Sequence, residues 1–546
     1  MNPLSRVEGG AKRLAEIAGV LAKYGLADWL GAVDAPWIRN RFKTEAGENL
    51  ARYSSEERFR LAIQELGASG IKLGQILSTR ADLVGAKLAT ELSKLQEQAD
   101  ADPFDQVRAL VERELGEPLD KLFASFEEQP RASASIGQIH QATLRDGQQV
   151  VVKVIHGGIE PQVHRDLDIL LFLADLMEKH APWLRQYQPM STARDFRRTL
   201  LREMDFGYEA RHLQEFAENF REDATVHFPE IHPDFCTRRV LTMERLEGIP
   251  VSDVEALRAS GEDLNEFARR AATVYLDMIF RDGFYHADPH AGNLMLLPGA
   301  VVGIMDCGMV GRIDETLRDE IEGMLLAAVA PDPAQLVEIV CRIGAVPPEL
   351  DREDLRVELS GLIADFRAQP LYRFDLAGAL SSVIGLIRRF QIHLPHGFAM
   401  LLKTVIMLEG TLRRANPSFN LTELLAPHYR RALHRTLAPK RIAYEMARSF
   451  RDWRRLINAL PRDLSDILSR IRNESFEVHL EHRRLEQTVH HLVKGLLASA
   501  LFMGSAMLLS TRLPPAPGGI SIPGSMGCMA ATILAVQLLY TIGRSK

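Results

Sequence analysis

The feature of this 546-residue sequence that most limits its fold is a polar octapeptide, HADPHAGN, at residues 286–293. An apolar segment, residues 301–305, follows it and ends at Asp306. The valines and isoleucine of that segment predict a strand, so Asp306 begins the loop after it. The side-chain oxygens of Asp306 and Asn293 are hard ligands that suit Mg²⁺, and Asp288 adds a carboxylate that can accept or orient a proton. The segment therefore predicts a metal-assisted site built on loops at strand ends.

A second chemical residue stands on an apolar strand earlier in the chain. Residues 136–143 and 148–155 predict two strands joined at Asp146-Gly147, a strong hairpin signal. The second strand carries Lys153 after three valines, and burying a lysine there is costly unless it meets an anion. Small residues in the preceding loop, residues 132–138, let backbone N–H groups approach a phosphate.

These pieces stand in the order of the protein-kinase signature, H-R-D-x-x-x-x-N followed by D-F-G. His286, Asp288 and Asn293 keep the relative positions of its His, Asp and Asn, and Asp306 follows Asn293 by thirteen residues. Each residue alone has a plainer explanation, such as an edge-strand charge for Lys153. The complete set in kinase order favours a nucleotide site.

Other kinds of site are disfavoured. The four cysteines lie far apart with no CxxC pair, which argues against a disulfide framework and a zinc ribbon. His286 and His290 need a helix to share one face, and Pro289 favours a loop, so a histidine metal site is also disfavoured. The net charge of −6 gives no case for binding nucleic acid.

Three further motifs make the sequence resemble the UbiB (aarF-type) family of atypical kinase-like proteins, which is linked to ubiquinone biosynthesis. Residues 72–75 match the family's KxGQ motif, residues 132–138 resemble its alanine-rich loop, and residues 203–205 resemble its ExD motif. The resemblance covers residues 50–430. It implies an α+β, bilobal protein-kinase-like fold with a helical N-terminal extension, and MgATP as the bound nucleotide.

The resemblance also implies roles for single residues. Glu209 is favoured over Glu203 as the partner of Lys153, while Glu203 and Asp205 are expected to face Lys72 and Gln75. In full, it assigns catalysis to Asp288 and Lys153, ATP binding to Ala134, Ser135, Ile136, Gly137, Lys153, Glu209 and Glu244 (the last at the hinge), Mg²⁺ binding to Asn293 and Asp306, and regulation to Lys72, Gln75, Glu203 and Asp205.

Two positions depart from the family's pattern. Cys307 replaces the Phe of D-F-G, which leaves open what packs beneath the helix that bears the partner of Lys153. Ser133 interrupts the alanine-rich run. Neither change touches the expected metal ligand Asp306.

The C-terminus predicts a transmembrane helical hairpin. Residues 495–511 and 520–542 carry no charge, and each is close to the roughly 20 residues needed to cross a bilayer. Small residues at spacing four predict close helix packing; they are Gly495 with Ser499, Ala500 with Gly504, and Gly527 with Ala531 and Ala535. A buried soluble helical pair is the alternative.

Charge predicts the orientation of the hairpin. Basic residues flank it on both sides, while its connecting turn holds only Arg512, so the body is expected on the cytoplasmic side of a bacterial inner membrane. Residues 411–490 carry 16 basic and 9 acidic side chains, a local excess of +7. The arginines between Arg448 and Arg472 face anionic lipid headgroups or, equally, solvent.

The chain is expected to divide into six parts: an amphipathic N-terminal segment (1–58), packed on the body rather than on a membrane; a helical KxGQ extension (59–130); an N-lobe (131–248); a C-lobe (249–430); a basic helical collar (431–490); and the hairpin (491–546). The interrupting charges near the N-terminus argue against a signal peptide.

Together these features predict a membrane-anchored, ATP-dependent atypical kinase or ATPase that supports ubiquinone biosynthesis. Its expected partners are bilayer lipids and quinone precursors, with other ubiquinone-biosynthesis enzymes and a homodimer as open alternatives. A true kinase of a lipid or protein hydroxyl, and a nucleotide-gated lipid-binding protein without essential chemistry, also remain open. The KxGQ segment disfavours a protein acceptor, because in the family it lies across the site where a kinase takes its protein substrate.

Overall fold

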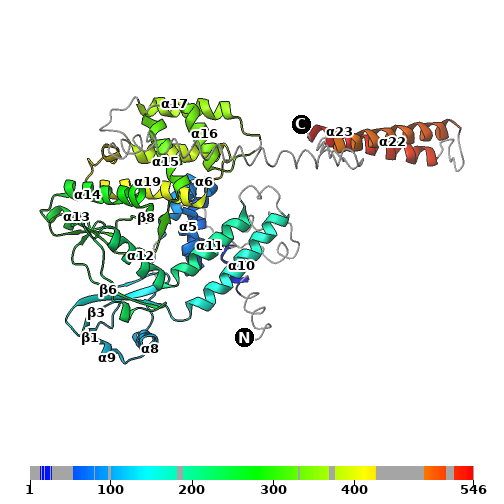
Figure 1. Ribbon diagram of the computed structural model, residues 1–546. Helices are drawn as coiled ribbons and strands as arrows, with labels where there is room; N and C mark the ends of the chain where they lie inside the picture. The colour runs from blue at the N-terminus through cyan, green and yellow to red at the C-terminus, as the bar shows by residue number, and fades with distance from the viewer. Residues whose placement is uncertain are drawn as a thin grey trace, which may run out of the picture. The chain divides into compact units, whose positions relative to one another are not determined.

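The computed structural model describes residues 13, 15–17, 19–21, 23, 24, 26, 53–78, 80–95, 100–180, 188–329, 332–347, 349–367, 375–425, 485–511 and 522–544. The chain divides into two compact units, residues 1–438 and residues 439–546. In the first unit, one lobe holds an antiparallel sheet and the other is mainly helical, with α5 and α12 between them (Figure 1). This is the predicted α+β bilobal architecture.

The helical extension comes first. Its helices are α4 (Ser55–Glu65), α5 (Ala68–Ser78), α6 (Ala81–Val84) and α7 (Ala86–Leu92). α4 begins with a capping box, in which Ser54 and Glu57 each accept the other's backbone N–H. A Cβ at Gly74 would lie 2.2 Å from Leu95 Cδ1, so the glycine of the KxGQ motif lets α5 pack tightly on the segment after α7.

The described part of the N-terminal segment packs against this unit. Arg13 Nε donates to Asp166 Oδ1 at 2.7 Å, and Lys23 Nζ donates to Glu65 Oε2 at 2.7 Å. Leu26 is buried. These contacts favour the packed helix over one that lies on a membrane surface.

The sheet lobe contains a sheet in the order β1-β3-β4-β6, with β2 paired to β3. Gly147, at φ 93°, lets the chain turn between β3 and β4, so the predicted hairpin is confirmed. Lys153 lies on the central strand β4, opposite Ile139 on one side and Leu241 on the other. The elements are α8 (Phe104–Leu115), α9 (Leu119–Leu122), β1 (Phe123–Phe126), β2 (Ala132–Ser133), β3 (Gly137–Leu144), β4 (Gln149–Ile155) and β6 (Val240–Glu244).

Three helices separate β4 from β6, as the helical insertion predicted near residues 160–221. They are α10 (Ile159–His180), α11 (Pro189–Glu203) and α12 (Phe206–Asn219). α10 and α11 pack against each other and each contacts α5 (Figure 1). α12 carries Leu213 and Phe216, both fully buried, against the sheet lobe.

The second lobe holds two small sheets among helices. β5-β10-β9-β7 form one sheet and β8-β11 the other. These elements are β5 (Val226–His227), η3 (Pro233–Phe235), β7 (Ile249–Pro250), α13 (Val254–Ala259), α14 (Leu264–Asp277), η4 (Met278–Asp282), β8 (Phe284–His286), β9 (Leu294–Leu297), β10 (Val301–Ile304), β11 (Val310–Arg312), α15 (Glu315–Val329), α16 (Pro333–Ile343), α17 (Arg352–Arg367), α18 (Leu376–Arg389) and α19 (His396–Ala415).

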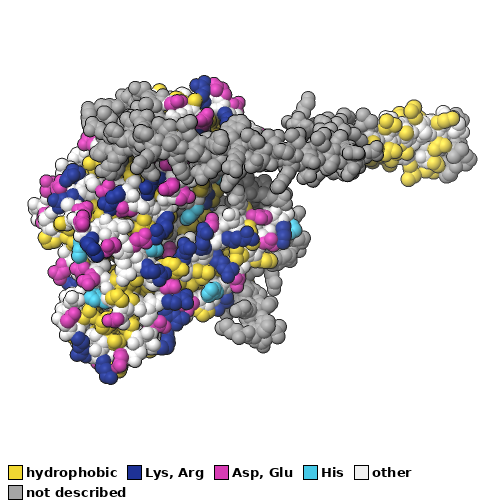
Figure 2. Space-filling model, in the orientation of Figure 1, with side chains coloured by type: hydrophobic (Ala, Val, Ile, Leu, Met, Phe, Trp, Pro, Cys, Tyr) yellow, Lys and Arg dark blue, Asp and Glu magenta, His cyan; other side chains and the backbone are white. Residues whose placement is uncertain are grey.

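The described part of the second unit is a pair of helices, α22 (Leu485–Ser510) and α23 (Ile522–Arg544), packed side by side (Figure 1). Large apolar side chains crowd its exposed surface, among them Leu496, Met503 and Ile533 (Figure 2). Within the described residues, Val493–Ser510 is long and apolar enough to cross a membrane, and Ile522–Gln537 is a shorter apolar stretch. The basic collar, including Arg448 to Arg472, lies outside the described residues.

The predicted small-residue contacts are half right. Ala531 is buried and Gly527 and Ala535 are partly buried, as predicted for α23. On α22, however, Ser499, Ala500 and Gly504 are exposed, and Ala498 and Ser505 are buried instead. The buried residues Ala498 and Ser505 are seven positions apart, and residues seven apart lie closer to one face of a helix than residues four apart do. The residue composition of α22 does not distinguish its two faces.

The closest approach of the two helices gives a direct test. A Cβ built on Gly527 would lie 2.1 Å from Ser505 Oγ. In a Cys528→Ser background, cysteines at positions 505 and 527 are therefore expected to form a disulfide readily when vesicles are oxidised. The matched pair at positions 504 and 527 is expected to stay reduced, because Gly504 has no neighbour within 4 Å. Equal cross-linking of both pairs would contradict the packing.

Candidate nucleotide site

Two short strand pairs bring the predicted site loops together. β9 begins directly after Asn293, β10 ends two residues before Asp306, and Leu294 pairs with Ile304 across them. β8 ends at His286, which pairs with Val310 on β11. The polar octapeptide joins β8 to β9, and the loop at Asp306 joins β10 to β11. Because β8 pairs with β11 and β9 pairs with β10, the two loops lie next to each other.

Lys153 is the electrostatic centre of the site. Its ammonium donates to Glu209 Oε1 at 2.5 Å and to Asp306 Oδ2 at 3.0 Å. The side chains of Lys153 and Glu209 are 10% and 7% exposed, while that of Asp306 is 46% exposed. One buried cation thus bridges a buried carboxylate on α12 and an open carboxylate at the metal-binding loop.

The charges of these three groups do not balance. Burial raises the pKa of Glu209, and the charge of Asp306 raises it further against the effect of Lys153. Burial would lower the pKa of Lys153, but Asp306 and Glu209 together hold it above its usual value. Burial raises the pKa of Asp306, although the side chain is half exposed. The charge of Lys153 and the hydrogen bond from the Gly308 N–H lower the pKa more, so the net shift is downward. One lysine facing two carboxylates leaves an excess of negative charge that a cation would balance.

Asn293 and Asp306 supply oxygen ligands for such a cation. The Asn293 amide Nδ2 donates to the Asp288 carbonyl at 3.1 Å, which leaves its amide oxygen as the hard ligand. Asp306 Oδ1 accepts from Gly308 N at 2.9 Å, which orients the carboxylate. Two protein ligands suit Mg²⁺, which completes its shell with phosphate oxygens and water. The described residues hold no group of three His, Cys, Asp or Glu side chains suited to a metal.

His286 is a buried support for Asp306 rather than a reacting group. Its Nε2 donates to the Asp306 carbonyl, so its Nδ1 accepts from Tyr275 O–H at 2.8 Å. Burial lowers the pKa of His286, which favours this neutral form. Neither Tyr275 nor this role was found from the sequence, because Tyr275 lies in α14 with no motif around it.

Cys307, in place of the expected Phe, is fully buried. His212 on α12 donates from Nδ1 to the Cys307 carbonyl at 3.0 Å. Burial raises the pKa of the Cys307 thiol well above its usual value, so the side chain is a neutral, small core residue. A polar contact from α12 therefore joins the metal-binding loop to the helix that bears Glu209.

The KxGQ lysine is paired with the ExD glutamate. Lys72 Nζ lies 3.1 Å from Glu203 Oε2, and both side chains are largely buried. The prediction for Asp205 is wrong: it caps α12 by accepting from Gly207 N at 3.0 Å and pairs with the exposed Arg238 at 3.1 Å. An aspartate just before a helix satisfies an otherwise unpaired N–H group, which is why it turns away from α5.

The alanine-rich loop is held as a tight turn. Ala134 N donates to the Gly137 carbonyl at 2.9 Å, and His156 Nε2 donates to the Ala134 carbonyl at 2.9 Å. A Cβ at Gly137 would lie 2.5 Å from the Val154 carbonyl, so only glycine fits there. Ser135 and Ile136 are buried in this turn. His156 was missed because it follows the lysine strand without a motif of its own.

Glu244 ends β6, where the hinge was predicted, but its carboxylate is committed elsewhere. It accepts from His227 Nε2 at 2.8 Å and from Glu230 N at 3.1 Å. Its assignment to the hinge that would contact adenine stays a prediction, and the carboxylate itself already has these two partners. What remains for a nucleotide at this position is the backbone of the hinge.

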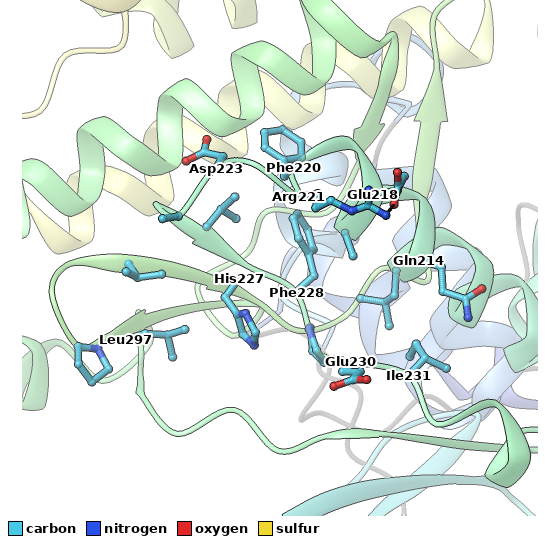
Figure 3. A pocket seen from close by; sticks show the side chains of 17 residues that line it. Gln214, Glu218, Phe220, Arg221, Asp223, His227, Phe228, Glu230, Ile231 and Leu297 are labelled. Atoms are coloured by element: carbon cyan, nitrogen blue, oxygen red, sulfur yellow. Dashed lines mark ion pairs between the residues drawn. The ribbon is translucent and has the colours of Figure 1, made fainter.

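A hollow of about 830 Å³ lies nearby but is not this site. It is lined by the C-terminal end of α12 and the segment around β5, with Phe220, His227 and Phe228 among its residues (Figure 3). Glu218 and Arg221 form an ion pair at its edge. Lys153, Asp288, Asn293 and Asp306 are absent from its lining, so this hollow is separate from the predicted site residues.

Comparison with known proteins finds three matching domain models. An ABC1 atypical kinase-like domain model matches residues 94–340, a UbiB helical domain model matches residues 359–420, and an ABC1/UbiB kinase-like C-terminal domain model matches residues 479–544. A probable protein kinase UbiB of Tolumonas auensis is 31% identical over 94% of this chain and 96% of its own length.

Other relatives give the same result. A probable protein kinase UbiB of Marinobacter nauticus is 31% identical over 85% of this chain and 86% of its own. Among solved structures, Rv3197 of Mycobacterium tuberculosis in complex with erythromycin covers 70% of this chain and 97% of its own, at 21% identity and a TM-score of 0.48.

Proposed function

Because this chain belongs to the UbiB family of atypical kinase-like proteins, we propose that it is an MgATP-dependent enzyme that supports ubiquinone biosynthesis at the bacterial inner membrane. The observation that carries the proposal is the contact of Lys153 with both Glu209 and Asp306. In kinases the corresponding lysine pair and metal-binding aspartate must both be in place for phosphoryl transfer.

Each residue has a defined part in the proposed reaction. Lys153 neutralises the α- and β-phosphates, and Asp306 with Asn293 would hold Mg²⁺, which neutralises charge on the transferring group. Asp288 takes the proton of the attacking hydroxyl while the hydroxyl oxygen forms a bond to the γ-phosphorus. The bond from the γ-phosphorus to the β–γ bridging oxygen breaks, and ADP leaves.

The position of α5 favours a small acceptor, either water or a lipid-linked hydroxyl. The buried Lys72–Glu203 pair ties α5 to α11, and Ser78 at the end of α5 contacts Lys403 on α19. An anchored helix between these elements leaves little room for a protein substrate.

The hairpin supports a membrane location for this chemistry, with the body on the cytoplasmic side. Removing residues 491–546 is expected to give a more soluble protein that still binds MgATP, because every proposed site residue lies in the first unit, residues 1–438. The truncated chain should complement a deletion strain poorly, since quinone precursors with long apolar chains reside in the bilayer. Full complementation at native expression would contradict the membrane role.

The experiment that tests the proposal compares the full chain with Asp288→Asn in vesicles. Wild type is expected to bind MgATP, to consume it, and to restore the quinone in lipid extracts of a deletion strain. The variant should keep nucleotide binding within a few-fold and lose both turnover and quinone. Absence of Mg-dependent nucleotide binding in wild type would overturn the proposal. Full complementation by Asp288→Asn would contradict an enzymatic role and favour the alternative, a nucleotide-gated lipid-binding protein.

A further inference from the structure

α19 is docked directly on the loop that carries Asp288. Thr404 Oγ1 donates to the Ala287 carbonyl at 3.1 Å, and it is also within hydrogen-bond distance of the Met400 carbonyl of its own helix. Thr404 and Ala287 are both fully buried. The residue before Thr404 is therefore held close to the proposed catalytic carboxylate by a buried contact between the helical lobe and the loop.

That residue is Lys403, a largely buried lysine that no motif identifies. Within the described residues its ammonium makes one hydrogen bond, a long one of 3.4 Å to Ser78 Oγ, and no ion pair within 4 Å. Ser78 lies at the end of α5, one helical turn after Gln75 and two after Lys72. Lys403 thus contacts the end of the KxGQ helix, and the residue after it, Thr404, contacts the loop that carries Asp288.

The charges around Lys403 come from these same two elements. Burial lowers the pKa of Lys403, the carboxylate of Asp288 opposes that shift, and the ammonium of Lys72 adds to it. A buried ammonium with one weak hydrogen bond is costly unless another anion completes its shell.

The loop itself supplies no permanent cation beside Asp288. Ala287 stands where the kinase pattern has arginine, and the nearest basic side chain on the loop, His290, is half exposed and lies 3.8 Å from Asp288 Oδ2. Charge that develops on a transferring phosphoryl group needs a positive partner in this position. A lysine from the helical lobe meets that need.

We infer that Lys403 is a catalytic cation, whose ammonium contacts the γ-phosphate of bound ATP opposite Asp288. The inference rests on the proposed function and extends it to a residue outside the kinase motifs. When nucleotide is bound, Lys403 exchanges its weak contact with Ser78 for the phosphate oxygens. α5 supplies both Ser78 and Lys72, so the KxGQ helix provides a contact and a like charge to Lys403.

The test is Lys403→Met in the full chain, measured in vesicles with MgATP as the probe. Turnover is expected to fall about 100-fold. The dissociation constant for MgATP should change less than threefold, because Lys153 and the metal ligands still hold the nucleotide. The matched control is Arg414→Met, which removes an exposed cation from the same helix and is expected to leave turnover unchanged.

Lys403→Arg supplies a second readout that a packing role would not move. A lysine acts only while protonated, so wild-type turnover should decline as pH rises through the pKa of Lys403, which burial and Lys72 lower and Asp288 raises. Arginine stays charged. Lys403→Arg is expected to turn over MgATP at least tenfold faster than Lys403→Met. Its turnover should also decline at a higher pH than that of wild type.

Two results would overturn the inference. One is turnover of Lys403→Met within threefold of wild type. The other is a fall in its MgATP affinity or unfolding midpoint that matches the fall in turnover, which would make Lys403 a structural residue. Failure of the proposed function is separate, because it would be seen in wild type as an absence of MgATP turnover before any variant is compared.

Discussion

Asp306→Asn is expected to lower MgATP turnover by about 10³-fold, the largest effect of a single conservative change in this protein. The substitution keeps the shape of the side chain but removes the charge that faces both Lys153 and the metal. Mg²⁺ would lose its one anionic protein ligand, and Asn293 alone supplies a neutral oxygen. The measurement is phosphate release by the full chain in vesicles across a Mg²⁺ titration.

Asp146→Asn is the matched control, because it makes the same chemical change in the exposed turn between β3 and β4. Asp146 accepts from Gln148 N there, and asparagine keeps that bond. Its turnover and its Mg²⁺ dependence should equal those of wild type. Unchanged Mg-dependent turnover in Asp306→Asn would remove Asp306 from the metal site.

Lys153→Met is expected to abolish nucleotide binding and to destabilise the first unit by about 3 kcal/mol. The change leaves Glu209 buried without a cation, beside the charge of Asp306. Adding Glu209→Gln should recover part of that stability, because it removes the unpaired buried charge, but it should not recover binding. The measurement is the urea unfolding midpoint of the full chain together with MgATP titration.

The control for this pair is Lys121→Met, which breaks the exposed Lys121–Glu117 pair. Solvent screens both charges there, so a change of less than about 0.5 kcal/mol is expected. If Glu209→Gln fails to restore any stability to Lys153→Met, the buried pair is not what holds α12 in place.

The site loops were predictable because their residues stand next to strands that pair locally. Asn293 precedes β9 and Asp306 follows β10, and these two strands pair as a hairpin. Pairing of neighbouring strands is therefore enough to place the two residues close together. Glu209 needed more than spacing, since 56 residues separate it from Lys153. The resemblance to a family supplied that partner, and the geometry agrees with it.

The residues that were misassigned or missed lie where local sequence has two uses for one side chain. Asp205 serves as a helix cap, a short-range duty that an acidic motif does not exclude. His212 contacts the Cys307 carbonyl and Lys403 contacts Ser78, partners that lie 95 and 325 residues away in the chain. Nothing in their neighbours marks such contacts.

The sequence by itself determined the kinase order of the motifs, the β3–β4 hairpin and the apolar C-terminal helix pair, because these depend on residue type, spacing and local turns. Only the tertiary structure decided which faces of α22 and α23 meet, and that Asp205 caps α12 instead of facing α5. It also docked Thr404, the residue after Lys403, on the Ala287 carbonyl of the loop that carries Asp288. Those outcomes depend on how helices pack against one another, and the competing partners have the same chemistry, so only their positions in space distinguish them.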